Sequence, residues 1–478
     1  MTRLYKGFLF KTKPWKHQLK ALSYLYNRDK AALYTKPGTG KTKVMLDLIV
    51  NKGWKRGIIV ATVKACEVWE QQFQLHTDID PKWVYNLQKM TLKQKAALMN
   101  KLCPKGKRGP LDEPMYLIIN YDSVWRKAFE NILYRKSCSL EFAICDESHH
   151  IKTPGSKCSM ALKRIGKAVN NKYLVTGTPM SENPLDVYAQ YRFLDDTIFG
   201  TSYSKFKERY ENVDPILTAK VGYVCLNKAQ PYINLDELRT KMYSCAFTIK
   251  PSVKLPKRKN LIVKFPISGE ALKVYRELEK DGISMKGVNA LRIKAALSKY
   301  LRLQQVCSGF MPTEDPYGNA KVFVLNHDRR DTLVKWLNRI DKHEPVVIFA
   351  AFRHDFDEIQ EACRIAGRSY SEVSGAKDNL HLWKKGKRNV VAVQYKSGSE
   401  SIDLTRARYL IYYNLTISLA LYEQSKKRIH RPGQTRECTY IHIVGDLPNR
   451  KDSVDRMILK SLKRKQDIVQ YIEQEGRD

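Results

Sequence analysis

The stretch TKPGTGKT, residues 35–42, lies between the apolar run AALY at 31–34 and the helical pattern KTKVMLDLIVNKG. A glycine-rich turn from a strand into a helix lets backbone amides and the N-terminus of the helix face an anion. The pattern predicts a phosphate-binding loop whose lysine reaches phosphate oxygens and whose threonine offers a hydroxyl to Mg²⁺. The residues expected at the phosphates are Gly38, Thr39, Gly40, Lys41 and Thr42.

The loop pattern is incomplete, because Thr35 replaces the first glycine of GxxxxGK[ST]. Taken alone, the match leaves open a glycine-rich turn that contains a lysine by chance. A second motif weakens that alternative. The run FAIC ends in Asp146 and Glu147, and acids at the carboxyl end of a buried strand face the ligand crevice of an open sheet. An isolated Asp-Glu pair also caps helices, but beside a phosphate-binding loop Asp146 is expected to hold Mg²⁺ and Glu147 to orient or deprotonate the attacking water.

Apolar runs of strand length recur along the chain, and their continuous character predicts strands buried on both faces of parallel sheets. The runs occupy residues 31–34, 57–62, 115–120, 142–147 and 172–177 in the first half, and 346–352, 389–394, 409–414 and 439–444 in the second. Helical patterns separate them, so the predicted fold is α/β with two parallel-sheet lobes. We expect a first lobe at 1–245, a linker and helical segment at 246–330, and a second lobe at 331–478.

The middle segment contains helical patterns at 271–280 and 291–307, whereas PSVKLPKRKN at 251–260 predicts a linker. The sequence shows no internal repeat, and no hairpin that would serve as a wedge between nucleic-acid strands.

Charge is the strongest compositional signal. The 478 residues include 85 Lys plus Arg against 49 Asp plus Glu, a formal net charge of +36. The chain is also 43% hydrophobic and 10% aromatic, which is typical of folded domains rather than a basic tail. Such an excess suits a polyanionic partner, and we expect nucleic acid.

The cysteine pattern and the length of the apolar segments indicate in which cellular compartment we expect the protein. The 10 cysteines form no Cys-x-x-Cys pair, so neither a zinc ribbon nor a disulfide framework is predicted, and the adjacent His149 and His150 lack ligand partners at suitable spacing. The longest uncharged run, 409–422, is shorter than the ~20 residues of a membrane span. We expect no membrane association and a location in the reducing cytoplasm.

Four segments, KPGTGKT, CDESHHIKTPGS, LVTGTPMSENPLDVYAQYRFLD and QSKKRIHRPGQ, occur in the order found in superfamily-two helicase-like ATPases. The chain resembles the Swi/Snf-like branch of that superfamily, in a compact form without accessory domains. The further matching segments are His17-Gln18, IIVATVKACEVWEQQF, IINYDSVWR, LRLQQVCSGF and SGSESIDLTRARYLIYYN. The resemblance covers nearly the whole chain and implies two RecA-like lobes that use ATP and Mg²⁺.

By position in these motifs, the resemblance assigns further residues to the nucleotide. Gln18 would read the edge of the adenine, with Trp15 or His17 beside it, although a polar residue at a helix start is the plainer interpretation. Asp403 would contact the ribose.

The basic stretch QSKKRIHRPGQ, residues 424–434, would act from the second lobe. The resemblance places Gln424, Arg428 and Arg431 across the cleft, where an arginine stabilises the charge that develops on the γ-phosphate in the transition state. For Lys426 and Lys427 we expect a solvated face.

The resemblance also indicates how nucleic acid would be held. The loop at 176–178, which comprises Thr176, Gly177 and Thr178, would couple hydrolysis to the grip on the nucleic acid. Phosphate contacts are expected from basic residues that follow strand ends or motif loops, although any one of them can equally be a solvated charge. These residues are Lys64, Lys152, Arg353 and Lys396.

Two segments depart from the branch. SGSESIDLT at 397–405 replaces a glycine-rich AGGxGLNLT, and YNLTIS at 413–418 replaces a segment with an aspartate and tryptophans. These departures bear on backbone contacts and on the rim of the cleft, and they leave the phosphate-contacting residues in place.

The sequence therefore predicts a monomeric, ATP-driven translocase on double-stranded DNA that binds largely without regard to base sequence. A strand-separating helicase on RNA or branched DNA shares all of these catalytic residues and stays open. A nonhydrolysing nucleic-acid-binding protein is the alternative of another class, which the presence of Lys41, Asp146, Glu147 and Arg431 disfavours. A compact motor would suit a virus, acting in its host cell, or a bacterium.

Overall fold

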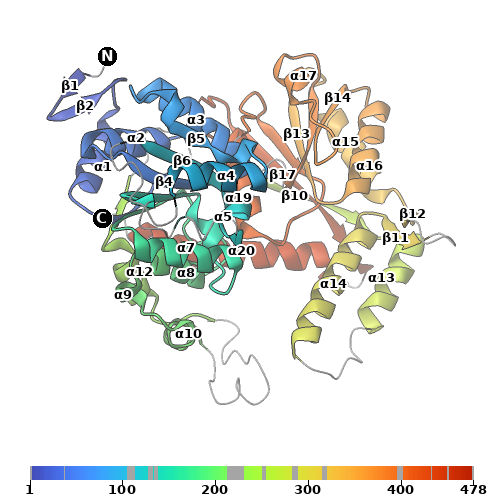
Figure 1. Cartoon of the computed structure of the whole chain (residues 1–478). Coiled ribbons are helices and arrows are strands. Elements are labelled where there is room, and N and C mark those ends of the chain that lie inside the picture. The colour runs from blue at the N-terminus through green and yellow to red at the C-terminus, as the bar shows by residue number, and fades with distance from the viewer. Residues whose placement is uncertain are drawn as a thin grey trace. The chain divides into compact units, whose positions relative to one another are not determined.

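The computed structural model describes residues 3–36, 38–104, 113–127, 133, 138–212, 231–249, 255–281, 289–314, 320–395, 402–431, 433–448 and 452–475. These residues form two compact units, whose elements are labelled in Figure 1. Unit 1 comprises the described residues within Met1–Pro215, Cys225–Ser252 and Ile468–Asp478, and unit 2 comprises those within Val253–Asp467.

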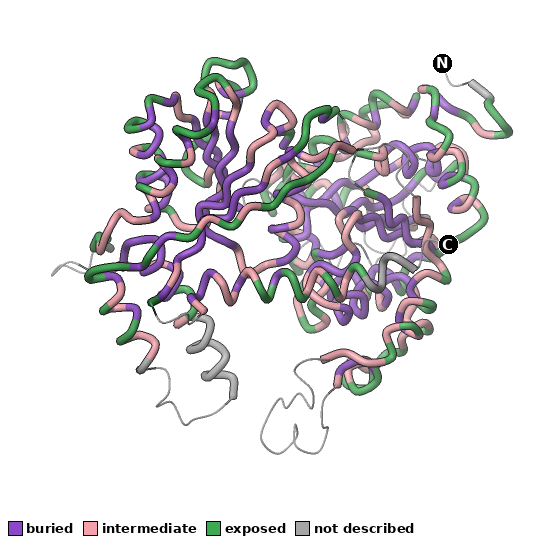
Figure 2. Tube along the Cα trace, turned by 180° about the vertical axis from the view of Figure 1, so that it is seen from behind, coloured by how far each residue is buried: buried purple, intermediate pink, exposed green. Residues whose placement is uncertain are grey.

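Unit 1 contains a seven-stranded sheet in the order β5-β6-β4-β7-β8-β3-β9, and every neighbouring pair is parallel. Its strands are β3 (Lys30–Tyr34), β4 (Arg56–Ala61), β5 (Val84–Asn86), β6 (Met115–Asn120), β7 (Phe142–Asp146), β8 (Asn171–Thr176) and β9 (Ala246–Thr248). Strands β4, β6 and β7 are buried along their whole length, which is why they have continuous apolar sequences (Figure 2).

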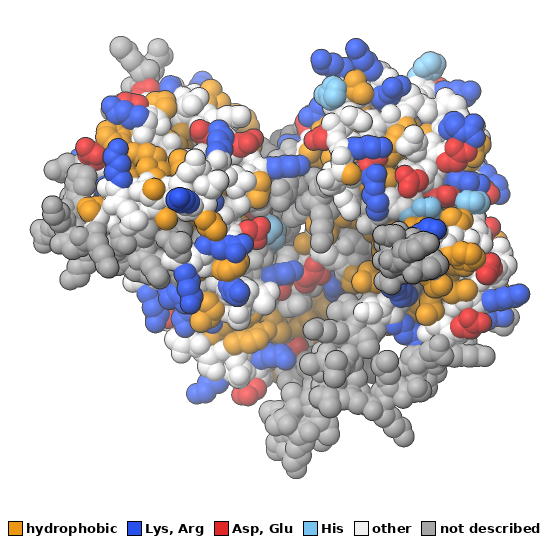
Figure 3. All heavy atoms as spheres, turned by 45° about the vertical axis from the view of Figure 1, so that its right-hand side comes forward, with side chains coloured by type: hydrophobic (Ala, Val, Ile, Leu, Met, Phe, Trp, Pro, Cys, Tyr) orange, Lys and Arg blue, Asp and Glu red, His pale blue; other side chains and the backbone are white. Residues whose placement is uncertain are grey.

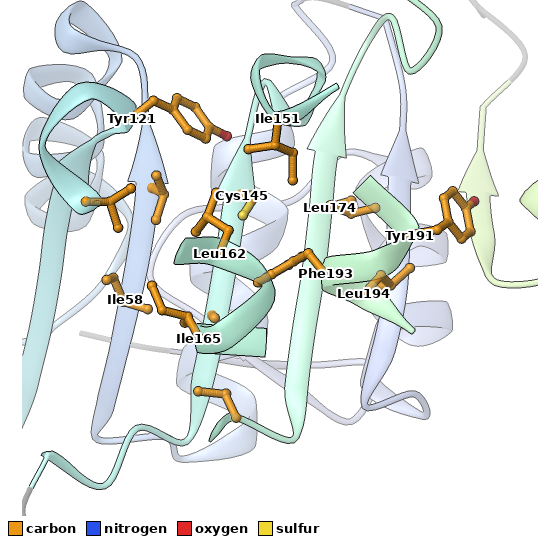
Figure 4. Close-up of a cluster of buried hydrophobic side chains, with 14 of the residues drawn as sticks. Ile58, Tyr121, Cys145, Ile151, Leu162, Ile165, Leu174, Tyr191, Phe193 and Leu194 are labelled. Carbon is orange, nitrogen blue, oxygen red and sulfur yellow. The ribbon is translucent and has the colours of Figure 1, made fainter. Parts of the chain in front are cut away.

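Helices cover both faces of this sheet. Side chains alternate between the faces along each strand, so Ile59 joins one apolar cluster and Val60 the other. The first cluster includes residues of α1 (Lys16–Tyr26), α2 (Lys41–Lys52) and α3 (Val63–His76). The second includes residues of α7 (Lys157–Ala168) and α8 (Val187–Leu194), and Figure 4 shows Leu162 and Phe193 over β7 and β8. The sheet is therefore the centre of a three-layer unit, and its carboxyl edge stays available for a site.

Shorter elements complete unit 1. An antiparallel hairpin of β1 (Arg3–Tyr5) and β2 (Phe8–Phe10) precedes α1. The other helices are α4 (Leu92–Leu102), α5 (Tyr121–Val124), α9 (Asp196–Phe199), α10 (Tyr203–Tyr210) and α12 (Leu235–Tyr243), with short 3₁₀ turns at Pro81–Trp83, Leu87–Lys89, Ser148–Ile151 and Pro184–Asp186.

Unit 2 contains a six-stranded sheet in the order β10-β17-β16-β13-β15-β14, again with every neighbouring pair parallel. Its strands are β10 (Arg258–Pro266), β13 (Val346–Ala350), β14 (Tyr370–Val373), β15 (Val390–Gln394), β16 (Tyr409–Tyr412) and β17 (Cys438–Asp446). Its helices are α13 (Gly269–Asp281), α14 (Asn289–Cys307), α15 (Asp328–Arg339), α16 (Arg353–Ile365), α17 (Leu380–Lys384) and α19 (Leu419–Ile429). Helix α20 (Val454–Glu475) starts in unit 2, and β11 (Phe310–Glu314) and β12 (Ala320–Val324) form a hairpin.

The structure confirms the predicted α/β fold with two parallel-sheet lobes, and each predicted apolar run contains a strand. The interpretation of 251–260 as a linker is wrong at its end, because Arg258–Asn260 begins β10. That strand is an edge strand with a single partner, so its basic residues remain exposed and hide the usual apolar signal. Beyond residue 245, β9 joins the sheet of unit 1, and β10, α13 and α14 belong to unit 2.

The sequence missed short or polar strands, including β5, β9 and β14, and it showed neither hairpin. None of the helices in the described parts of the chain combines the length and the apolar composition needed to cross a bilayer.

Candidate functional site

The glycine-rich turn between β3 and α2 adopts the backbone that its sequence predicts. Gly38 and Gly40 have φ values of 82° and 75°, in the left-handed region that favours glycine. A Cβ atom on Gly40 would lie 2.2 Å from Gln18 Nε2, so a side chain at this position would have to displace the Gln18 amide. Helix α2 begins directly afterwards at Lys41, which leaves its first amide groups at the turn.

The start of α1 packs against this turn. The carbonyl oxygen of Thr39 accepts hydrogen bonds from His17 Nε2 at 2.9 Å and from Gln18 Nε2 at 3.3 Å. The other end of the Gln18 amide accepts from the backbone N of Trp15 at 2.8 Å. Trp15 itself is 56% exposed. The two residues predicted to read adenine are therefore next to the phosphate-binding turn, with an exposed aromatic ring beside them.

Thr35, which stands where the pattern has glycine, contributes to the turn through its hydroxyl. Thr39 Oγ1 donates to the carbonyl of Lys36 at 2.9 Å, so the 2.9 Å contact between the Thr35 and Thr39 hydroxyls has Thr35 as donor. Lys41 Nζ donates to the carbonyl oxygen of Thr35 at 3.3 Å. The departure from the pattern therefore adds a hydroxyl hydrogen bond to the turn and keeps its shape.

Asp146 lies at the carboxyl end of β7 and is 8% exposed. Its Oδ2 accepts from Trp69 Nε1 at 2.8 Å, and its Oδ1 accepts from the backbone N of Glu147 at 3.0 Å. Burial raises the pKa of Asp146 to about 6, the neighbouring Glu147 charge adds to this, and Lys41 opposes it. Burial beside a second carboxylate disfavours the negative charge of Asp146, and a bound cation would offset that cost.

Glu147 is joined to the next strand end by a hydroxyl. Its backbone is left-handed, with φ of 49°, which is costly for a residue with a side chain. Thr176 Oγ1, at the end of β8, donates to Glu147 Oε2 at 3.2 Å. The same hydroxyl lies 3.1 Å from His149 Nδ1 and accepts from the backbone N of Thr178 at 3.1 Å. The loop at 176–178 is therefore physically coupled to the candidate water-orienting carboxylate.

The donor set of this site fits Mg²⁺. Mg²⁺ keeps several waters and takes one or two carboxylates plus substrate phosphates, so it requires no dedicated cage of protein ligands. Asp146 and the Thr42 hydroxyl on the first turn of α2 supply that kind of oxygen. No cluster of three or more His, Cys, Asp or Glu residues suited to a metal occurs among the described residues.

Unit 2 carries the other predicted nucleotide residues. Gln424 and Arg428 are one helical turn apart on α19 and half-buried, and Arg431 follows the helix. Asp403 is exposed and accepts from Thr405 N at 2.9 Å and from Thr405 Oγ1 at 2.7 Å. Burial acts to raise the pKa of Asp403, but these hydrogen bonds and the charges of Arg431 and Lys384 hold it below its ordinary value. The structure thus brings Asp403 into the electrostatic range of Arg431.

One of the two lysines predicted to form a solvated face in the stretch 424–434 is buried. Lys426 is 7% exposed, so the expected solvated face is wrong for this residue. Its Nζ pairs with Glu423 Oε1 at 3.0 Å and lies 3.9 Å from the centre of the Tyr422 ring. Lys426 occupies the helix face that packs on the sheet, where the lysine stem is buried and the ammonium is paired. Lys427 is half-buried.

Gln434 closes the stretch and was given no role by the sequence analysis. It is buried, and its Nε2 donates to the carbonyl oxygens of Thr405 at 3.0 Å, Ala407 at 2.9 Å and Ile429 at 3.2 Å. These bonds tie the end of α19 to the segment that contains Asp403. Trp69 was also missed, although it lies in one of the matching motifs. An indole that donates to a buried carboxylate leaves no pattern in the sequence.

The four candidate phosphate contacts differ in their surroundings. Lys64 is exposed at the start of α3. Lys152 Nζ is 3.7 Å from Glu182 Oε1, and Arg353 is paired with the buried Glu372 at 2.6 Å. Lys396 lies outside the described residues.

One residue of the departing segment 413–418, Asn414, has a defined structural role. Asn414 is fully buried, and its Nδ2 donates to Asp355 Oδ2 at 2.6 Å and to Ser308 Oγ at 3.0 Å. Its Oδ1 accepts from the backbone N of Ala351 at 2.8 Å. An aspartate here would set a second carboxylate against Asp355, whose pKa burial already raises to about 6.

Two family models match the chain. The family model described as the SNF2-related domain matches residues 17–310, and the one described as the helicase conserved C-terminal domain matches residues 328–433. The first match alone covers more than half of the 478 residues. The chain belongs to the SNF2-related family of helicase-like ATPases.

Individual relatives are distant. The chain is 25% identical over 399 residues to the ISWI chromatin-remodeling complex ATPase ISW1 of Saccharomyces cerevisiae, covering 78% of this chain and 33% of the relative. It is 24% identical over 354 residues to the DNA repair and recombination protein RDH54 of the same organism, covering 69% and 36%. The solved structure of the Sulfolobus solfataricus SWI2/SNF2 ATPase core in complex with dsDNA has a TM-score of 0.41 and 16% identity, covering 93% of this chain and 90% of that one. The chain spans about a third of the length of these curated relatives.

Proposed function

We propose that the chain is an ATP-dependent motor that translocates on double-stranded DNA. The observation that supports this most is the linked set of side chains at the carboxyl edge of the sheet in unit 1. There the phosphate-binding turn, Asp146, and the Glu147–Thr176–His149 contacts combine phosphate binding, cation binding and activation of water.

Each residue in unit 1 has a separate task in this proposal. The amides of the glycine turn and Lys41 bind the phosphates, for which Lys41 gives up its 3.3 Å bond to the Thr35 carbonyl. Asp146 and Thr42 would hold Mg²⁺, which would supply positive charge to neutralise the phosphate oxygens. Glu147 orients the attacking water and accepts its proton, and Thr176 fixes the position of that carboxylate.

The residues of unit 2 complete the site in the proposal. Closure of the two units on ATP brings Arg428 and Arg431 to the γ-phosphate, with Gln424 beside the water and Asp403 at the ribose. A contact made only in the closed state couples the two conformations to ATP binding and hydrolysis. Gln434 holds the Arg431 segment and the Asp403 segment together, so both would move as one body.

Double-stranded DNA is the proposed partner because of the formal charge of +36 and the family of the chain. The names of the relatives refer to chromatin remodelling and to DNA repair and recombination. Phosphate contacts by lysine and arginine give affinity without base specificity. A strand-separating helicase remains the second candidate, since it would use the same nucleotide site.

ATPase rates measured without nucleic acid, with single-stranded DNA, with duplex DNA and with RNA test the proposal. We expect duplex DNA to stimulate turnover most. Stimulation by RNA or single strands above that by duplex would replace the proposal with the helicase alternative, and an absence of turnover under every condition would leave only a binding protein.

A further inference from the structure

Two uncharged polar side chains lie inside unit 1, close to the nucleotide motifs. Figure 3 shows charged side chains spread over the face of the protein that it draws, whereas Ser148 and Gln190 are both 0% exposed. Ser148 directly follows Glu147, the candidate water-orienting residue, and Gln190 lies on α8. Buried polar groups require hydrogen-bond partners, so the contacts of these two side chains show what they hold together.

The side-chain amide of Gln190 uses both of its ends. Ser148 Oγ donates to Gln190 Oε1 at 2.7 Å. Gln190 Nε2 donates to the carbonyl oxygen of Pro179 at 2.7 Å and to that of Asp186 at 3.0 Å. Because carbonyl oxygens can only accept, the amide has one possible orientation, in which Ser148 is the donor. Gln190 therefore holds Ser148 and Pro179 at a fixed separation.

The bond to Ser148 acts on a strained part of the backbone. Glu147 has a φ of 49° and a ψ of 51°, in the left-handed region. A residue with a side chain keeps such a conformation only where the surrounding contacts hold it. The contacts of Glu147 include the bond from its backbone N to Asp146 Oδ1 at 3.0 Å and the bond from Thr176 Oγ1 to its carboxylate at 3.2 Å. Gln190 adds to these by fixing the residue that follows Glu147.

The same amide reaches the loop at 176–178, to which the resemblance gives the task of coupling hydrolysis to the grip on nucleic acid. The loop is followed by Pro179, whose carbonyl oxygen accepts from Gln190. It begins with Thr176, which donates directly to Glu147. The loop therefore has two links to the candidate water-orienting residue, one at its start and one through the buried amide beyond its end.

We propose that Gln190 is a positioning residue for ATP hydrolysis, which passes a shift of the loop 176–178 through Ser148 to Glu147. It touches neither the nucleotide nor the water, and it acts only through the backbone of Glu147. Nucleic acid bound against the loop would move Pro179 and, through the amide, Ser148, so that the carboxylate takes its productive orientation. This inference deepens the proposed function and rests on it, because it names a residue by which nucleic acid would stimulate turnover.

Two single substitutions and their combination, made in the full chain, test the proposal. Ser148→Ala breaks the link at one end, and Gln190→Met breaks it at the other with a flexible, unbranched side chain. The control is Ser371→Ala in unit 2, where a buried hydroxyl also donates to a carbonyl oxygen, that of Val390, at 3.0 Å. The measured quantities are kcat and KM for ATP, without nucleic acid and with saturating duplex DNA, and the melting temperature.

We expect each single substitution to lower the duplex-stimulated kcat about tenfold, the rate equivalent of one hydrogen bond. The KM for ATP and the unstimulated turnover should stay within about twofold of wild type. Since both residues belong to one link, the double variant should lose no more than the larger single loss. Ser371→Ala should keep its kcat, although its melting temperature falls as that of Ser148→Ala does.

Wild-type stimulation in a folded Ser148→Ala protein would overturn the inference, as would an equal loss of kcat in Ser371→Ala. A double variant whose loss is the product of the two single losses would also overturn it, because the two side chains would then act independently. If Gln190→Met fails to fold, Ser148→Ala and its control decide. A wild-type protein whose turnover no nucleic acid stimulates would reject the proposed function too, whereas normal stimulation in every variant rejects this inference alone.

Discussion

The nucleotide motifs of unit 1 and the stretch 424–434 of unit 2 are held in different ways. In unit 1 the candidate side chains contact their neighbours directly, as Asp146 does with Trp69 and Glu147 with Thr176. In unit 2 the helix that carries Gln424 and Arg428 is fixed from its buried side. Tyr422 bonds to His442 at 2.8 Å, Ser425 to Tyr412 at 2.9 Å, and the Tyr440 hydroxyl donates to the carbonyl oxygen of Lys426 at 3.0 Å.

This difference matches the proposed tasks of the two regions. A site that binds phosphate and cation by itself requires preorganised side chains. A helix that supplies arginines only on closure requires a rigid backbone and side chains that stay available. The comparison therefore predicts that substitutions in unit 1, and on the side of α19 that carries Gln424 and Arg428 (its reactive side), affect turnover. Substitutions on the buried side of α19 should affect stability instead.

The largest effect should follow from removing the arginine beyond α19. Arg431→Ala is expected to lower DNA-stimulated ATPase turnover about 10³-fold to 10⁵-fold, because an arginine at the γ-phosphate stabilises transition-state charge. Nucleotide binding by unit 1 should persist, and circular dichroism should show an unchanged fold.

Lys427→Ala is the matched control, since it removes a neighbouring positive charge that has no proposed role at the phosphate. Its turnover should stay within about twofold of wild type. Turnover near that of wild type in Arg431→Ala would show that this arginine takes no part in the chemistry. It would also contradict the proposed catalytic task of the stretch 424–434.

In unit 1, Glu147→Gln should lower turnover by about 10² to 10⁴, which is the usual contribution of a general base. ATP affinity should change little, because the amide keeps the volume of the side chain and can still accept from Thr176. Equilibrium binding of a nonhydrolysed ATP analogue, measured beside turnover, separates the two effects. If ATP binding fell as much as turnover, Glu147 would contribute to binding of ATP and not to activation of the water.

Much of both regions follows from the sequence. Continuous apolar runs predicted the central strands, because a parallel sheet buries both faces, and the positive φ of Gly40 follows from its motif. What escaped prediction depends on long-range packing. Gln434 donates to carbonyls of residues up to 29 positions away, and Trp69 meets Asp146 across 77 positions. From the sequence alone Lys426 is predicted to be a surface charge, because the sequence does not show which face of the helix it occupies.

Beyond the end of α19, Gln434→Ala should reduce stability by about 2 kcal/mol, since it leaves buried carbonyl groups without their donor. The melting temperature should fall by several degrees, about 4–8 °C for a unit of this size. Gln360→Ala, at an exposed position of α16, is the control and should change stability by less than about 0.5 kcal/mol. Equal melting temperatures for the two variants would mean that Gln434 does not fix the stretch.

The smallest effect tests whether the buried lysine of α19 is structural or functional. Lys426→Met keeps a long apolar side chain against Tyr422 and removes an ammonium whose burial is unfavourable, while Glu423, at 22% side-chain exposure, can be hydrated instead. We therefore expect the free energy of unfolding to change by less than about 1 kcal/mol and turnover to stay at the wild-type level.

The stability of the wild type and that of Lys426→Met should depend differently on pH. Burial lowers the pKa of Lys426 below its ordinary value of 10.5 in the folded state, and the Glu423 charge only partly offsets this. Between the lowered pKa and 10.5 the unfolded chain binds more protons than the folded one, so the stability of the wild type should rise with pH relative to that of Lys426→Met. Thermal unfolding of both proteins from neutral to alkaline pH measures the difference. A large loss of turnover in a stably folded Lys426→Met protein would show that this ammonium serves the chemistry, and the division between a reactive and a supporting side of α19 would then be wrong.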